Sequence, residues 1–222
     1  MKKEKLKIIY QDKDIIVVSK DTNLLTIGTE RERENTLYHK VLMYERSKHK
    51  ANKIFIVHRL DKDTSGIVLF AKNEKAKNIL QDNWDKYAIE RKYVAVVEGK
   101  LNKKEDEIRS YLKENSVHKV YSTKDKDGKL AITKYKVLNT SKSFSLIDID
   151  IKTGRKNQIR VHLSDIGNPI IGDKKYNSKY NPIRRLGLHA YKLVIKHPIS
   201  NEVMTFEDEI PKDFINMFKK NS

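Results

Sequence analysis

The chain has 222 residues, no cysteine and a formal net charge of +17, from 47 lysines and arginines against 30 aspartates and glutamates. The absence of cysteine excludes disulfides and thiolate metal sites, and the charge favours a polyanionic partner such as nucleic acid, although a lysine-rich AT-biased genome would give a similar excess. No run of residues has the length of a membrane span, and charged residues soon end the apolar run in residues 1–10, so we expect no membrane anchor, no signal peptide and a cytoplasmic location.

The first half of the chain alternates short apolar runs with one amphipathic pattern. Runs at 6–10 and 14–19 predict a strand pair, and helical spacing over 36–48 predicts a helix capped by Asn35 or Thr36. Further ranges predict strands at 54–57, 66–71 and 92–97, with a helix between them from Asn73 to about Tyr87. Residues 102–128 are polar and charged, and only a turn at Asp127-Gly128 is assigned there.

The second half predicts more antiparallel sheet. Ile147, Ile149 and Ile151 alternate with polar residues, which is typical of a strand with one wet face. The remaining ranges predict strands at 131–138 and 144–152, a helix at 156–165, a hairpin at 188–197 and 202–206, and a closing helix at 212–219. We therefore predict a single α+β domain over 1–222, with a mixed, mostly antiparallel β-sheet flanked by helices.

The polar segment 58–66 stands between two predicted strands, and it is the strongest candidate for a site. It reads His58-Arg59-Leu60-Asp61-Lys62-Asp63-Thr64-Ser65-Gly66. Catalytic groups are often mounted on loops held by rigid strands. The alternative is an ordinary polar turn, in which Asp63, Thr64 and Ser65 bond the backbone and Gly66 supplies an unusual dihedral angle.

This segment closely resembles the central motif of the RluA-type pseudouridine synthases, in which the aspartate is catalytic. Segments 91–99 and 153–162 resemble the tyrosine and arginine motifs of the same family, and segments 167–173 and 188–190 match its downstream pattern. The resemblance implies an isomerase that converts uridine to pseudouridine in RNA, with the active site in a central cleft. It also implies a form without the small N-terminal RNA-binding domain that many members carry, acting as a monomer without a cofactor or metal.

The same resemblance assigns roles to residues. Asp61 is the expected catalytic carboxylate, Arg160 would keep it ionised by bidentate pairing, and Tyr93 would stack on the uracil and assist proton removal. A stacked uracil must be flipped out of the RNA to be reached. The expected RNA contacts are His58, Arg59, Thr64, Arg155, Asn157, Gln158, His162 and His189, with Lys156, Lys174, Lys175, Arg184 and Arg185 holding the backbone. Asn157 stands where the family usually has histidine.

Two other interpretations remain open at this point. The string from Asp61 to Ser65 faintly resembles the nucleophile motif of magnesium-dependent aspartate phosphatases, but no convincing acidic pair follows it. A non-catalytic RNA-binding module would also fit the charge. The sequence does not distinguish ribosomal from transfer RNA as the target, nor attack on the base from attack on the sugar or an elimination route.

Overall fold

The computed structural model describes residues 6–30 and 32–219, so the basic start of the chain at 1–5 lies outside the described residues. The chain divides into two compact units. Unit 1 comprises the described residues up to Ile89 together with Ala190–Asp208, and unit 2 comprises Glu90–His189 together with the described residues from Glu209 onward. Each unit is described by itself below.

Unit 1 contains a sheet in the order β1-β2-β4-β10, with β11 paired to β10 and β3 paired to β4. The pairs β1–β2, β2–β4, β3–β4 and β10–β11 are antiparallel. The strands are β1 (Lys7–Gln11), β2 (Ile15–Lys20), β3 (Phe55–Ile56), β4 (Ser65–Ala71), β10 (Leu188–Lys196) and β11 (Val203–Glu207). All seven residues of β4 are buried. The strand that follows the Asp61 loop is therefore an internal strand, which gives the loop a rigid base.

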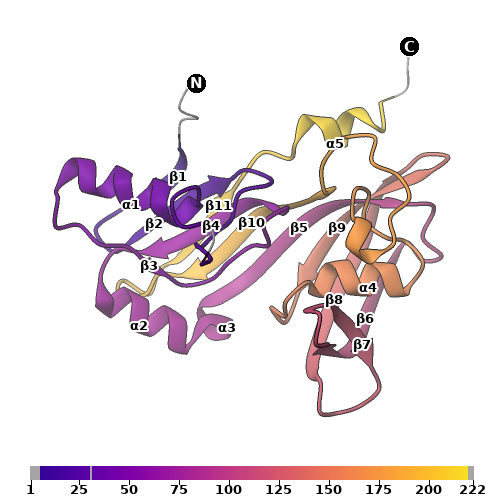
Figure 1. Ribbon diagram of the computed structural model, residues 1–222, viewed down its shortest axis with the longest axis horizontal. Helices are drawn as coiled ribbons and strands as arrows, with labels where there is room; N and C mark the ends of the chain where they lie inside the picture. The colour runs from indigo at the N-terminus through magenta and orange to yellow at the C-terminus, as the bar shows by residue number, and fades with distance from the viewer. Residues whose placement is uncertain (1–5, 31, 220–222) are drawn as a thin grey trace. The chain divides into compact units, whose positions relative to one another are not determined.

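Helices pack on this sheet, and their starts follow the predicted caps. Helix α1 (Leu37–Lys48) begins at Thr36, whose hydroxyl accepts from the backbone N–H of His39 at 3.1 Å. Helix α2 (Glu74–Asp82) begins at Asn73 and packs on β3 and β4, as Figure 1 shows. The single helix predicted from Asn73 to Tyr87 is wrong, because the chain breaks at Asn83 before α3 (Trp84–Tyr87). The Asn83 side chain bonds the Ile79 carbonyl, a competition that disfavours a continuous helix.

Unit 2 contains an antiparallel sheet in the order β5-β9-β8-β6-β7. The strands are β5 (Ala88–Glu98), β6 (Glu105–Glu114), β7 (Val120–Thr123), β8 (Lys129–Thr140) and β9 (Phe144–Ile151). Strands β6 and β7 occupy the range to which only a turn was assigned, so that interpretation is wrong. Glu107 and Arg109 on β6 are exposed while Leu112 is buried. The many charges on the wet face hid the alternation that marks a strand.

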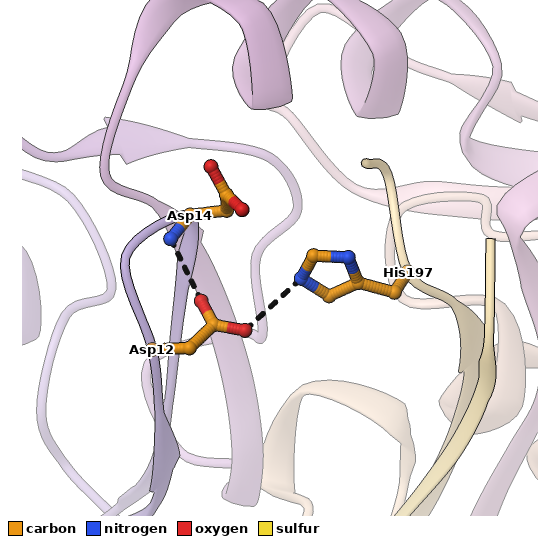
Figure 2. Close-up of side chains that lie close together, drawn as sticks. All are labelled: Asp12, Asp14 and His197. Carbon is orange, nitrogen blue, oxygen red and sulfur yellow. Dashed lines mark hydrogen bonds and ion pairs between the residues drawn. The ribbon is translucent and has the colours of Figure 1, made fainter. Parts of the chain in front are cut away.

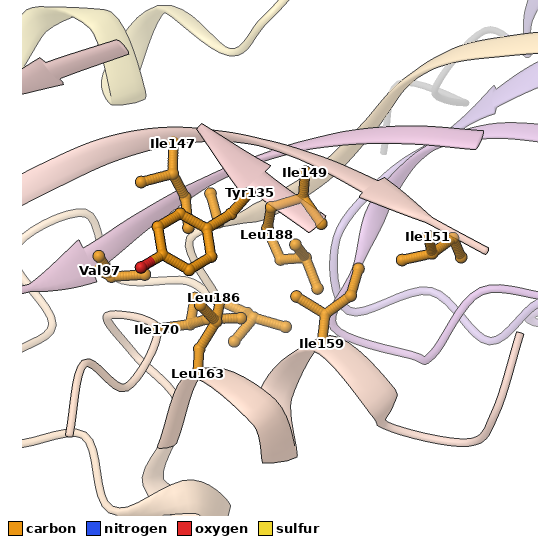
Figure 3. Packing of buried hydrophobic residues seen from close by; sticks show 11 residues of the cluster. Val97, Tyr135, Ile147, Ile149, Ile151, Ile159, Leu163, Ile170, Leu186 and Leu188 are labelled. Atoms are coloured by element: carbon orange, nitrogen blue, oxygen red, sulfur yellow. The ribbon is translucent and has the colours of Figure 1, made fainter. Parts of the chain in front are cut away.

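One face of this sheet forms the core of unit 2 with helix α4 (Gln158–Asp165). Figure 3 shows Ile159 and Leu163 of α4 pointing toward Ile147 and Ile149 of β9. On the opposite face the neighbouring charges pair across strands, as between Lys92 and Asp148 at 3.1 Å. The alternation predicted for 144–152 is confirmed.

Short helices complete the described residues. The 3₁₀ helix η1 (Lys174–Tyr176) follows α4, and α5 (Lys212–Asn216) is shorter than the predicted closing helix. In the described part of the chain no helix is both long enough and apolar enough to cross a membrane. The predicted α+β class, with a mixed, mostly antiparallel sheet flanked by helices, is confirmed. The extent of one domain over 1–222 stays a prediction.

Candidate active site

A buried ammonium group fixes the loop that carries Asp61. Lys20, at the end of β2, is 1% exposed. Its Nζ donates to the carbonyl oxygens of Asp21 at 2.9 Å, Leu24 at 2.7 Å and Lys62 at 2.9 Å. An ammonium group has three N–H donors, which these three carbonyls match. The main chain directly after Asp61 is therefore held by the charged side chain of Lys20, which comes from β2.

Two threonines hold the same loop on either side of the candidate carboxylate. Thr22 Oγ1 donates to the carbonyl of Asp63 at 2.7 Å. Thr26 Oγ1 donates to the carbonyl of Leu60 at 2.8 Å and accepts from the Leu60 N–H at 3.2 Å. The side chain of Asp61 between these anchors is half-buried. These anchors bond backbone atoms of the loop only. The anchoring therefore does not depend on which side chains the loop carries.

The two ends of the loop are fixed differently. His58 Nε2 accepts from the backbone N–H of Leu69 at 3.0 Å, and its ring stacks on Trp84 with centroids 4.4 Å apart. Gly66 has φ +116°, and a Cβ placed there would lie 2.1 Å from the carbonyl oxygen of Ala190. Only glycine fits at this end, because a side chain would meet the neighbouring strand.

Arg160, in the first turn of α4, forms a buried bidentate ion pair with Asp173. Its Nε lies 2.7 Å from Oδ2 and its Nη2 lies 2.8 Å from Oδ1 of Asp173. The two side chains are 9% and 1% exposed. Because Asp173 takes the Nε–Nη2 edge, a second anion can make two parallel bonds to this guanidinium only on the Nη1–Nη2 edge.

Asn157 and Tyr176 lie beside this pair. Arg160 Nη1 contacts Asn157 Oδ1 at 3.4 Å, and Asn157 Nδ2 donates to the Tyr176 hydroxyl at 3.0 Å. The Arg160 guanidinium carbon also lies 5.2 Å from the centre of the Tyr176 ring. Asn157 at the N-cap of α4, Asp173 at the N-cap of η1 and Tyr176 of η1 therefore contact one guanidinium in unit 2.

The third expected catalytic residue, Tyr93, lies on β5 opposite Ile149 of β9. It is half-buried and packs against the core of unit 2. Of the expected catalytic set, Tyr93 and Arg160 belong to unit 2, and Asp61 belongs to unit 1.

Several expected RNA contacts have interior positions. Thr64, Asn157, Gln158, His162 and His189 are all buried. The His162 ring bonds the hydroxyl of Thr133 at 2.9 Å and that of Ser110 at 3.0 Å, and burial lowers the pKa of His162 from 6.5 to about 4. A neutral, enclosed imidazole of this kind holds α4 to the sheet and does not supply a positive charge to RNA at neutral pH.

Gln158 is engaged in the same way. Its Oε1 accepts from the Thr153 hydroxyl at 2.7 Å and from the Arg155 N–H at 3.1 Å. Its Nε2 donates to the Ile132 carbonyl at 3.0 Å and to the Thr133 hydroxyl at 2.9 Å. The amide thus fixes the turn that leads from β9 into α4.

Other expected RNA contacts reach the surface. Arg59 is exposed, and His58 and Arg155 are half-buried. Arg155 Nε donates to the Leu130 carbonyl at 3.0 Å. Beside it lies a hollow of about 380 Å³, whose charged lining residues are Lys113, Glu114, Asp127, Lys129, Arg155 and Lys156.

The basic segment 174–185 is the second charged surface of unit 2, and it carries Lys174, Lys175, Lys179, Arg184 and Arg185. One carboxylate oxygen, of Glu98, accepts three hydrogen bonds from the middle of this segment. Glu98 Oε1 accepts from the Ser178 hydroxyl at 2.7 Å, the Lys179 N–H at 2.6 Å and the Tyr180 N–H at 3.0 Å. The basic segment is therefore folded onto the end of β5.

One cluster in unit 1, drawn in Figure 2, has the residue types of a metal site: Asp12, Asp14 and His197. His197 Nδ1 accepts from the Ser200 N–H at 3.1 Å, so Nε2 carries the proton that points to Asp12 Oδ2 at 3.0 Å. Asp12 Oδ1 accepts from the N–H groups of Asp14 and Ile15. These bonds close the β1–β2 turn, so the cluster has a structural explanation.

Three residues that shape the candidate site were not predicted as site residues. Lys20 follows the apolar run 15–18 and Ser19, and a lysine at the end of a buried strand was the available signal. Asp173 and Tyr176 lie in or just after segment 167–173, which was matched as a pattern without roles for its side chains. Their contacts with Arg160 became visible only in the fold.

Comparison with known proteins defines the class. Residues 14–165 match the family model described as RNA pseudouridylate synthase. Human RNA pseudouridylate synthase domain containing 4 has a similar structure, with a TM-score of 0.77 and 22% identity over 94% of this chain and 90% of that protein's chain. Human RNA pseudouridylate synthase domain containing 1 is also similar, with a TM-score of 0.74 and 24% identity over 93% of this chain and 84% of that protein's chain. At these identities the solved structures establish the fold.

Curated relatives of known sequence agree with this class. The chain is 33% identical over 214 residues to the uncharacterized RNA pseudouridine synthase YhcT of Bacillus subtilis, covering 96% of this chain and 71% of the relative. It is 32% identical over 234 residues to the ribosomal large subunit pseudouridine synthase D of Zymomonas mobilis, covering 96% and 72%. The chain belongs to the RluA-type RNA pseudouridine synthases and is an isomerase that acts on RNA.

Proposed function

We propose that this enzyme converts specific uridines of ribosomal RNA, transfer RNA or both to pseudouridine, with Asp61 as the catalytic carboxylate. The observation that carries the proposal is the anchoring of the Asp61 loop. Lys20, Thr22 and Thr26 fix the backbone on both sides of a half-buried carboxylate. Catalysis requires a reacting group that is already in place. The names of relatives such as the ribosomal large subunit enzyme of Zymomonas mobilis support ribosomal RNA as a substrate class.

The reaction breaks the bond between uracil N1 and the ribose, forms a bond from C5 to the same ribose carbon, releases the C5 proton and adds a proton to N1. An ionised Asp61 would act on the sugar or the base at this centre. Arg160 would pair with the carboxylate through its Nη1–Nη2 edge, because Asp173 holds the other edge. Tyr93 would stack on the uracil and assist removal of the C5 proton. No atoms or electrons are gained or lost, so the scheme uses neither cofactor nor metal.

We assign RNA contacts to the exposed residues and supporting roles to the buried ones. A target uridine must leave its stack, and Arg59, which is exposed on the Asp61 loop, would occupy the gap or bind phosphate. Arg155 and the basic segment 174–185 would bind the backbone without reading sequence. We assign His58 to bracing the loop, and Thr64, Gln158, His162 and His189 to supporting the site from the interior. We further propose that the enzyme acts as a monomer in the cytoplasm.

The test uses RNA labelled with tritium at uracil C5, because isomerisation releases that hydrogen to water. Wild-type enzyme should release tritium from total RNA of a strain that lacks the gene. Asp61→Ala should release none while binding RNA within about threefold of wild type, because one side chain at the reacting centre is removed. Asp63→Ala, two residues away in the same loop, is the matched control and should stay active.

The outcomes separate the parts of the proposal. Release by Asp61→Ala at the wild-type rate would refute the role of Asp61. Sequencing of the wild-type products then identifies the modified RNA. If pseudouridine formed only in messenger RNA, the proposed substrate class would be wrong, although the enzyme would remain a synthase.

A further inference from the structure

The side chains around Arg160 form a hydrogen-bond chain with a fixed direction. A guanidinium group has only donors, so the oxygen of the Asn157 amide must face Arg160, and its nitrogen must face Tyr176. The Tyr176 oxygen then accepts this bond. The order Arg160 to Asn157 to Tyr176 is therefore set by chemistry, and the amide cannot reverse without placing donors against the guanidinium.

The side chain of Asn157 does not cap helix α4, although Asn157 is the N-cap residue. It is the N-cap of α4, where an asparagine side chain ordinarily accepts from a free N–H of the first helical turn. Here it makes no such cap bond, and its backbone has the left-handed φ of 54°. Asparagine tolerates that conformation better than most residues. The side chain is thereby turned away from the helix and toward Arg160 and Tyr176.

Tyr176 provides a firm end to the chain of hydrogen bonds. It is 3% exposed and packs in a cluster with Leu112, Val120 and Val161. Burial is the main cause that raises the pKa of its hydroxyl. The hydroxyl is therefore un-ionised at neutral pH and adds no charge beside Arg160. It restrains the amide without competing for the guanidinium.

We propose that Asn157, held by Tyr176, is a positioning residue that sets the direction of the Nη1 side of Arg160. Asp173 fixes the Nε–Nη2 edge, and the neutral amide limits rotation at the remaining corner while leaving the positive charge for an anion at the reacting centre. This inference rests on the proposed function of Arg160. The restraint on Arg160 comes from the neutral pair Asn157 and Tyr176. A second carboxylate at this place could not fill the same role, because it would form its own ion pair with the guanidinium.

Asn157→Asp tests this directly, because it keeps the size of the side chain and the left-handed backbone. The new carboxylate would bind Arg160 more tightly, and a negative charge at the start of α4 is favourable for the helix. We expect kcat for tritium release to fall by about tenfold or more, as for other losses of alignment. KM for RNA should change by less than about threefold, and Tm should stay equal or rise. A residue needed only for stability would lose Tm and activity together.

Tyr176→Phe is the second variant, and it removes one oxygen while keeping the ring in its cluster. We expect kcat to fall by about three- to tenfold, the effect of losing one neutral hydrogen bond. Tyr135→Phe is the matched control, since Tyr135 is also buried in unit 2 but lies in the other core cluster. It should leave kcat unchanged.

A coupling measurement completes the test. Arg160→Lys removes the geometry that Asn157 is proposed to set, so adding Tyr176→Phe to it should lower kcat no further. Independent, multiplied losses would overturn the inference while leaving the synthase assignment intact. Wild-type kcat in Asn157→Asp would also overturn it. Failure of wild-type enzyme to release tritium would instead count against the proposed function itself.

Discussion

Asp61 in unit 1 and Arg160 in unit 2 are held by different kinds of atoms. In unit 1, the Asp61 loop is fixed through its backbone, by the Lys20 ammonium group and by the close approach of Gly66 to Ala190. In unit 2, Arg160 is fixed through its own side chain, chiefly by Asp173. The position of the Asp61 loop thus depends on residues that take no part in the proposed reaction. The position of Arg160 depends on side chains that match its charge and its hydrogen-bond donors.

The largest effect should come from removing the charge that holds Arg160. Asp173→Asn leaves a buried guanidinium without its carboxylate, and breaking such a pair typically costs about 3–5 kcal/mol. We expect a loss of this size in urea unfolding, with a fall in kcat. Asp165→Asn is the control: Asp165 is exposed and accepts from Ser122, so its loss should stay within about 0.5 kcal/mol. Equal stability of Asp173→Asn and wild type would break the comparison.

The second effect concerns backbone approach in unit 1. In Gly66→Ala the new Cβ would lie 2.1 Å from the Ala190 carbonyl oxygen at a positive φ. We expect destabilisation of about 3 kcal/mol or more, at the upper end for overpacking. Gly167→Ala is the matched control, because its φ is also positive but no atom lies within 4 Å of the added Cβ. It should lose only about 1 kcal/mol, the conformational part alone. Similar losses in both variants would mean that the close approach is unimportant.

The third effect depends on pH and on the buried His162. The unfolded chain binds a proton at this ring near pH 6.5, but burial delays binding in the folded chain to about pH 4, the lowered pKa of this group. Stability from this group is therefore complete above about pH 6.5 and is lost as the pH falls through the window toward 4. The expected loss at pH 4 is about 3 kcal/mol.

Thermal unfolding between pH 7 and pH 4 measures this loss. His162→Gln should flatten the acidic part of the curve, whereas His118→Gln, at an exposed position, should leave it unchanged. A wild-type curve that is flat down to pH 4 would show that the ring is more accessible to protons than its burial indicates.

The smallest of these effects concerns the ammonium anchor. Lys20→Met keeps the length of the side chain but leaves the carbonyls of Asp21, Leu24 and Lys62 without this donor. We expect a loss of about 2 kcal/mol, because the variant no longer buries a charge and this gain partly offsets the unmet carbonyls. Lys62→Met, in the same loop, should have little effect, because the anchor contacts the carbonyl of Lys62 and not its side chain. If the two variants were equally stable, the anchor would not be what holds the loop.

Most elements of the fold were predictable because their residues repeat with the period of a strand or helix. Helix α1 with its Thr36 cap and the alternation in β9 are examples. Strands β6 and β7 were missed because charges on their wet faces concealed the pattern. The break at Asn83 was missed because propensity over a window does not show a single side chain that bonds the backbone.

The candidate site was predictable only in part. Asp61, Tyr93 and Arg160 came from motifs, which are continuous in the chain. Their supports are not continuous: Lys20 reaches a carbonyl 42 residues later, and Asp173 reaches Arg160 from a separate segment. The burial of His162 was also invisible in the motif, because a histidine reads the same whether it faces RNA or the core.

The carboxylate of Glu98 has a consequence for association. By accepting three bonds from residues 178–180, it orders the middle of the basic segment 174–185 within the folded protein. A flexible basic segment would lose conformational entropy when it met a polyanion, and that loss would weaken the complex. Here much of that entropy is already given up during folding, so a phosphate backbone would meet cations whose spacing is set in advance.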